Sequence, residues 1–201
     1  MNQMDRKTLL ERAGVGAGVL ALPALFGAEA ALAGAPPNSR IALWIVVSRA
    51  ASAQGSVLPT IAFGGMVAFR PEQEFIKGGG NFQIFDFNKP AAERTPLVTG
   101  AWQATEFVGW TTENLAGTSL PSFGQIQPSV LDAKIEMDVL GEATMEFACN
   151  VGFAGPISTG RPETVLLTTS QYGIFNNPIP TAFASLTSSS IPGYPNVPVT
   201  A

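Results

Sequence analysis

The stretch that decides the fold is VLDAKIEMDVLGEATMEFAC, residues 130–149. Apolar and charged residues alternate from Val130 to Leu140, and the same alternation resumes after Gly141. Successive side chains of a β-strand point to opposite faces, so a period of two predicts strands with one dry and one wet face. One continuous strand of this length would be exceptional. We therefore predict two strands joined by a tight turn near Gly141.

Further strands are predicted on both sides of this hairpin, because short apolar segments alternate with clusters of Gly, Pro and Asn. The pair Gly64-Gly65 inside one of them indicates a β-bulge or a close approach of two backbones. The run Gly78-Gly79-Gly80-Asn81 is predicted to be a turn. The further strands are expected at residues 41–48, 61–69, 82–87, 98–110 and 163–170, with another beginning within 172–175.

This pattern predicts an all-β fold, either a single antiparallel β-barrel or a β-sandwich, with little helix after residue 33. In architecture it resembles the small exported barrels of the calycin and allene-oxide-cyclase-like kind. No motif is shared, so the resemblance implies a fold and no function. We expect residues 34–175 to form this domain. Residues 176–201 carry five prolines and a serine run, which predicts an extended tail that either lies on the domain or is disordered.

The first 33 residues have the order of a secretory signal peptide: a charged start, an apolar stretch and a cluster of small residues. The apolar stretch, residues 13–26, is shorter than the roughly 20 residues that a transmembrane helix needs. Residues 1–33 are therefore expected to be cleaved, without leaving a stable membrane anchor.

Arg6-Lys7-Thr8-Leu9-Leu10 resembles the core of a bacterial twin-arginine (Tat) signal, in which two arginines precede a variable residue and two apolar residues. Lys7 stands at the place of the second arginine, and the general secretory route is the alternative. The resemblance implies a bacterial protein that folds before export. We expect it to be periplasmic, cell-surface or extracellular.

Composition excludes several kinds of chemistry. The chain has no histidine and one cysteine, Cys149, so neither a Ser-His-Asp nor a Cys-His catalytic arrangement can be built. Zinc, copper and non-haem iron sites normally use histidine or several cysteines, and we expect no metal and no cofactor. Cys149 has the apolar parity of its strand, which predicts a small buried residue. A net charge of −4 without a basic patch disfavours nucleic acid as a partner.

The most informative candidate site lies in the long aromatic strand. Trp102, Glu106 and Trp110 have the same parity, so a regular strand places them on one face. If that face is the dry one, the Glu106 carboxylate is desolvated between two indoles, which suits a general acid or base or the polar anchor of a ligand pocket. The alternatives are that Glu106 faces solvent or pairs with an arginine such as Arg70 or Arg94.

A second carboxylate, Asp86, lies two residues before the sequence Asn88-Lys89-Pro90. This position favours a carboxylate that caps a turn. The alternative is a pairing of Asp86 with Glu106 for glycosidase-type chemistry, in which two carboxylates act together.

Three functions remain open at this point. The first is an exported, non-enzymatic domain that binds a small apolar or amphipathic ligand, or a surface component, through Trp102, Glu106 and Trp110. The second is a structural or self-assembling envelope protein, in keeping with the low charge and the many Gly, Ser, Thr and Pro residues. The third is a cofactor-free isomerase, cyclase or glycosidase with Glu106 as its catalytic residue. The lack of a recognisable catalytic arrangement favours binding over catalysis.

Overall fold

The computed structural model describes residues 34–37, 39–90, 93–112, 118–120, 124–126, 129–149 and 164–190. The described residues are almost entirely β-structure, with a single 3-10 turn at Pro71–Gln73. This confirms the predicted all-β class. The strands are β1 (Arg40–Ala50), β2 (Pro59–Arg70), β3 (Phe75–Asp86), β4 (Val98–Thr112), β5 (Thr118–Leu120), β6 (Gly124–Ile126), β7 (Ser129–Met137), β8 (Gly141–Cys149), β9 (Thr164–Thr169) and β10 (Gly173–Ser190).

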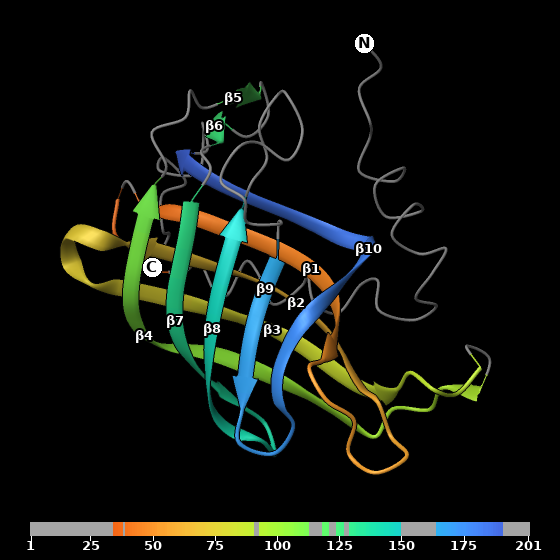
Figure 1. The fold of residues 1–201 in the computed structure, drawn as a ribbon. Helices are drawn as coiled ribbons and strands as arrows, with labels where there is room; N and C mark the ends of the chain where they lie inside the picture. Colours follow the sequence, from red (N-terminus) through yellow and green to blue (C-terminus); the bar gives the residue numbers. More distant parts are fainter. Residues whose placement is uncertain are drawn as a thin grey trace.

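Of the two architectures predicted, the barrel is the one adopted (Figure 1). The strands pair in the order β1-β2-β3-β4-β7-β8-β9-β10, and β10 pairs with β1 to close the cylinder. All of these pairings are antiparallel. The short strands β6 and β5 extend the sheet from β10 as a small hairpin. Closure removes the two outer strands that an open sheet would have, since β1 and β10 pair with each other.

The alternating stretch that predicted the hairpin forms β7 and β8. The two strands pair from Ser129 with Cys149 to Met137 with Gly141, and residues 138–140 make the turn. Gly141 has a φ of 75°, a left-handed conformation that glycine adopts without steric cost. The apolar parity of both strands faces the core: Leu131, Ala133, Ile135, Met137, Ala143, Met145 and Phe147 are all buried. The side chain of Cys149 lies outside the described residues.

The glycine run at 78–80 is not a turn, contrary to the prediction. It lies within β3, and β3 pairs with β2 without a break from Pro59 opposite Asp86 to Arg70 opposite Phe75. The continuous register also excludes a bulge at Gly64-Gly65 and leaves the other predicted option, a close approach of backbones. A Cβ on Gly80 would lie 2.0 Å from the Gly64 carbonyl oxygen.

Two of these glycines, Gly65 and Gly80, belong to a row of residues that crosses four strands. Trp44 on β1 is opposite Gly65 on β2, Gly65 is opposite Gly80 on β3, and Gly80 is opposite Trp102 on β4. The two indoles stack inside the barrel with centroids 5.3 Å apart, and the Trp102 Nε1–H donates to the Gly64 carbonyl at 3.1 Å. A Cβ on Gly65 would meet the Trp102 ring, whereas a Cβ on Gly80 would meet the β2 backbone. Gly65 thus leaves room for the two tryptophans, which fill the barrel at this level.

The barrel also extends beyond the domain end predicted at residue 175, because β10 continues to Ser190. The prolines that argued against a strand are accommodated by an irregular pairing. Ser48 is opposite Pro178 while Val46 is opposite Phe183, so residues 179–182 bulge out of the ladder against a single residue of β1. Pro180, which has no N–H, lies in this bulge, where backbone groups are left unpaired. Pro178 is in the ladder opposite Ser48. Residues 191–201 of the predicted tail and the predicted signal peptide at 1–33 lie outside the described residues.

Among the described residues, no helix has the length and hydropathy that crossing a membrane requires.

Candidate functional site

The three residues predicted to share a site are separated by the structure. Trp102 is buried in the core at 1% exposure. Trp110 is half-buried and packs against the core. Glu106 instead lies on the outer surface, where its Oε2 accepts a hydrogen bond from the Lys134 Nζ on β7 at 2.7 Å. The expectation that Glu106 lies between the two indoles on the dry face is therefore wrong, and the partner that it finds is a lysine.

Two β-bulges in β4 cause this difference. The pairing of β4 with β7 skips Thr105, between Ala104 and Glu106, and skips Val108, between Phe107 and Gly109. Each extra residue shifts the alternation of side chains by one position. The first bulge turns Glu106 outward and Phe107 inward, and the second turns Trp110 inward again. Trp102 and Trp110 therefore keep the same face, as expected from their parity, while Glu106 does not.

The ion pair of Glu106 and Lys134 lies in solvent, and the side chain of Glu106 is 54% exposed. The hydrogen bond and the charge of Glu106 raise the pKa of Lys134 above its ordinary value of 10.5, with a smaller contribution from the charge of Glu142. Because the pKa of Lys134 is raised on folding, the pair stabilises the fold below pH 10.5 and loses this effect as the pH rises through the raised pKa.

We expect Glu106→Gln to return the pKa of Lys134 toward its ordinary value and to change the stability of the fold only slightly, because exposed ion pairs contribute little. NMR titration of the Lys134 side chain and urea unfolding measure the two effects. Glu142→Gln is the matched control, since it removes a carboxylate that acts on Lys134 only through its charge. An equal fall in the pKa of Lys134 in both variants would contradict this account.

Asp86 has the turn-capping role that its position predicts. Its Oδ1 accepts the backbone N–H of Asn88 and the backbone N–H of Leu58, both at 3.0 Å. Asp86 is 7% exposed. The hydrogen bond from Asn88 closes the turn after β3, and the one from Leu58 connects the end of β3 to the segment that precedes β2. Asp86 and Glu106 occupy different environments, one buried in a turn and the other on the outer surface, so they do not form a pair of catalytic carboxylates.

The arrangement that sequence reasoning missed lies at the end of the barrel where β1 begins and β4 ends (Figure 1). Arg40, the first residue of β1, has the parity of Ala42, Trp44 and Val46, which face the core. Its guanidinium carbon lies 4.0 Å from the ring centroid of Trp110. An arginine thus caps the interior face of the strand and stacks on an indole, a favourable cation–π contact.

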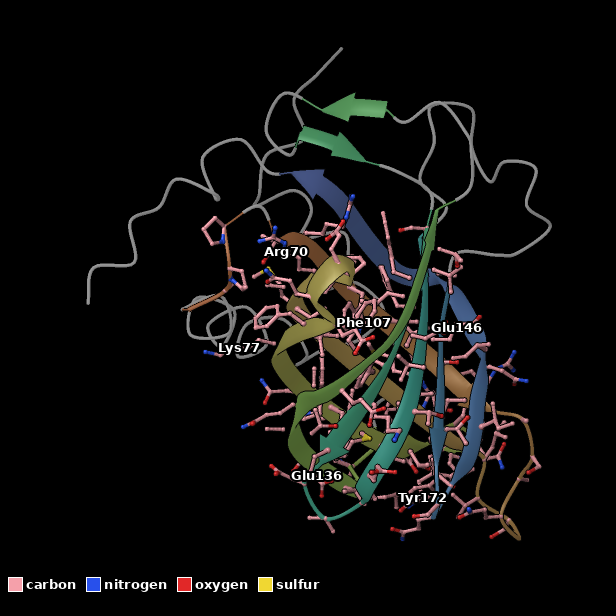
Figure 2. The ribbon with its side chains drawn as sticks, turned by 90° about the vertical axis from the view of Figure 1, so that its left-hand side faces the viewer. Arg70, Lys77, Phe107, Glu136, Glu146 and Tyr172 are labelled. Atoms are coloured by element: carbon pink, nitrogen blue, oxygen red, sulfur yellow. The ribbon has the colours of Figure 1, made fainter. Side chains whose placement is uncertain are left out.

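Aromatic side chains surround this contact. The Phe69 ring, opposite Arg40 in the β1–β2 pairing, lies 5.9 Å from the Trp110 ring and 6.5 Å from the Phe107 ring, measured between centroids. Figure 2 places Phe107 toward the same end of the barrel as Arg70, with Tyr172 at the opposite end. Ser129, the first residue of β7, lies at the same end of the barrel. We call Arg40, Phe69, Phe107, Trp110 and Ser129 the mouth cluster.

Three hydrogen-bond donors of the mouth cluster are buried without a partner among the residues that the structure describes: one terminal nitrogen of Arg40, Nε1 of Trp110 and Oγ of Ser129. Ser129 is 2% exposed and lies one inward position beyond Leu131, which is opposite Trp110. Buried polar groups nearly always have a partner, and leaving one unpaired costs about 1–3 kcal/mol. Among the described residues the same is true of Trp44 Nε1, Ser48 Oγ and Arg49 Nε, and the mouth cluster holds the other three groups.

The electrostatic environment of Arg40 also reflects its partial burial. Burial lowers the pKa of Arg40, and the nearby charge of Glu72 only partly opposes the effect. Glu72 forms its ion pair with Arg70, at 3.9 Å. An arginine remains charged at neutral pH even when its pKa is lowered, so the mouth cluster holds a poorly hydrated positive charge over an aromatic surface.

A sequence signal for Arg40 does exist, but it is weak. The segment 41–48 is apolar at nearly every position, so its parity does not distinguish the inner from the outer face. A charged residue at the start of such a strand is normally solvated. Only the closed barrel, which brings the start of β1 to the end of β4, makes Arg40 and Trp110 neighbours.

No group of three or more His, Cys, Asp or Glu residues within the described ranges is placed to hold a metal ion. Comparisons of the chain with protein-family models, with curated proteins and with solved structures found no match.

Proposed function

We propose that this protein is an exported, non-enzymatic binding protein for a small amphipathic ligand, and that the ligand binds at the mouth cluster. The observation that carries the proposal is the set of three unpartnered donors beside three aromatic rings at one end of a closed barrel. Ligand sites typically combine aromatic walls with a few polar groups that orient the ligand. A bound polar group would supply the partners that the donors lack.

The packing of the interior favours the mouth over the centre of the barrel as the place of binding. Trp44, Phe63, Trp102 and Phe147 form a cluster of ring contacts with centroids 5.0–5.9 Å apart. All four side chains are buried to 2% exposure or less. Side chains therefore fill the barrel at mid-height, as they do in small barrels without a central ligand.

The other two functions receive less support from specific residues. A carboxylate enzyme centred on Glu106 would need a desolvated carboxylate, whereas Glu106 is exposed and ion-paired. An envelope protein that assembles through the outer strands of an open sheet would need β1 or β10 to be free, whereas these two strands pair to close the barrel.

We expect the amphipathic fluorophore 1-anilinonaphthalene-8-sulfonate to bind the folded protein, and Trp110→Leu to weaken this binding about tenfold or more. The substitution removes both the indole N–H and the surface on which Arg40 stacks. Fluorescence titration measures the affinity. Val108→Ala is the matched control, because Val108 is on the same strand but is exposed. Absence of binding to the folded native protein, or equal affinities for native protein and Trp110→Leu, would refute the proposal.

A further inference from the structure

We propose that the polar group recognised at the mouth cluster is a carboxylate, carried by a short apolar chain. This inference rests on the proposed function and specifies the chemical class of the ligand. It follows from three properties of the site: the kind of hydrogen-bonding groups that it presents, its charge, and the distance to the tryptophans below it.

The hydrogen-bonding groups of the site select an acceptor. Arginine and the indole of tryptophan can only donate, so the Arg40 nitrogen and Trp110 Nε1 require an acceptor on the ligand. Ser129 can donate or accept, and its buried Oγ has no partner among the described residues. A carboxylate offers two acceptor oxygens with about four lone-pair sites and matches the planar guanidinium. An ammonium group, which only donates, would leave the Arg40 and Trp110 donors unpaired and would face a like charge.

The charge of the site favours a monoanion. The mouth cluster contributes one positive charge, from Arg40, and the negative charge of Glu72 is close enough to act on it. A dianion such as a phosphate monoester would therefore bring one more negative charge than the cluster can balance. A carboxylate balances the single guanidinium, and a charge-assisted pair in a poorly hydrated place is stronger than one in water.

The tryptophan row limits the length of the apolar part. Trp44 lies four residues after Arg40 on the same face of β1, a span of about 13 Å for an extended strand. Trp44 and Trp102 are completely buried and stacked at that level. The interior between the two levels is itself filled by buried Ala42, Phe69 and Leu131. The apolar part of the ligand can therefore extend only a short way beyond the mouth cluster, which favours medium-length chains such as that of octanoate over long-chain fatty acids.

The test compares three probes that share one chain: octanoate, octan-1-ol and octylammonium, titrated into the full protein by isothermal titration calorimetry. We expect octanoate to bind about tenfold or more tightly than octan-1-ol, and octylammonium to bind least. In Arg40→Gln, octanoate and octan-1-ol should bind equally. Arg49→Gln is the matched control: Arg49 is on the same strand, stacked on Phe87, and its loss should leave the preference unchanged.

Ser129→Ala provides a second variant in case Arg40→Gln does not fold. It removes one small donor, and octanoate binding should weaken severalfold, more than octan-1-ol binding, because hydrogen bonds to a charged acceptor are the stronger ones. Octan-1-ol or octylammonium binding as tightly as octanoate would overturn the carboxylate inference and leave the proposed function standing. The same conclusion follows if 1-anilinonaphthalene-8-sulfonate binds at the mouth cluster and octanoate does not. If none of the probes binds, both proposals fail.

Discussion

Gly80→Ala is expected to destabilise the protein by at least about 3 kcal/mol, at the upper end of what overpacking causes. A Cβ on Gly80 would lie 2.0 Å from the carbonyl oxygen of Gly64 and 2.6 Å from the Cα of Gly65. Both atoms belong to the backbone of β2, so a side-chain movement cannot relieve the clash. Relief requires β2 and β3 to separate, which breaks their ladder of hydrogen bonds. Urea unfolding followed by circular dichroism measures the loss.

Gly109→Ala is the matched control for this prediction. Gly109 is also a strand glycine, but its nearest neighbours would be Asp132 side-chain atoms at 3.6 Å and 4.0 Å, ordinary contact distances. Removing one strand glycine there should change stability by no more than about 1 kcal/mol, in either direction. Comparable losses in Gly80→Ala and Gly109→Ala would mean that the close approach of β2 and β3 does not determine the choice of glycine.

Trp102→Ala is expected to cost about 3–5 kcal/mol, the range for removal of a large aromatic side chain from a core. The indole stacks on Trp44, contacts Phe63 and donates a buried hydrogen bond to the Gly64 carbonyl. Its removal would leave a cavity between β2, β3 and β4, and would also remove the partner of that carbonyl. The free energy of unfolding in urea is again the measurement.

The hydrogen bond can be separated from the packing by two conservative variants. Trp102→Phe loses ring volume and the Gly64 hydrogen bond, whereas Trp44→Phe loses ring volume alone, because the Trp44 Nε1 has no partner among the described residues. We expect Trp102→Phe to be the less stable by about 1 kcal/mol, a typical net value for one hydrogen bond. If Trp44→Phe is equally unstable, packing alone accounts for the effect of Trp102.

Local alternation predicted much of this barrel. The β7–β8 hairpin was predictable because Leu131, Ala133 and Ile135 face the core while Asp132 and Lys134 do not, and a period of two leaves few other structures open. The buried strands β1, β2 and β9 were likewise recognisable from short apolar segments between turn residues. In each case the information lies within ten or so consecutive residues.

The features that could not be predicted all depend on neighbours distant in sequence. The run at Gly78–Gly80 has the composition of a turn, and only the close approach of the β2 and β4 backbones to β3 explains why glycine is needed inside a strand there. The proline content of β10 argued for a tail, and only its pairing with β1 shows that the chain can bulge around residues 179–182. Propensity was overridden by tertiary contacts in both segments.

The prediction that Trp102, Glu106 and Trp110 share a site was wrong for a related reason. Parity placed Trp102 and Trp110 correctly on the inner face and Glu106 incorrectly, because parity holds only while a strand remains regular. No residue pattern between positions 103 and 109 predicts a bulge. Arg40 was overlooked because its role depends on which strand end lies across the barrel from it.

The pair of bulges in β4 has a consequence for how the length of this chain can vary. Thr105 and Val108 are each unopposed by a residue of β7, so neither is needed to keep the two strands in step. A shortened strand that lacks either residue would still direct Trp102, Phe107 and Trp110 inward and Glu106 outward. Loss of a residue from the regular part of β7 would instead reverse the facing of every side chain beyond it. Deletions in β4 are thus expected to be tolerated at Thr105 and Val108. Elsewhere in the strand, the loss of one residue would change which side chains face the core.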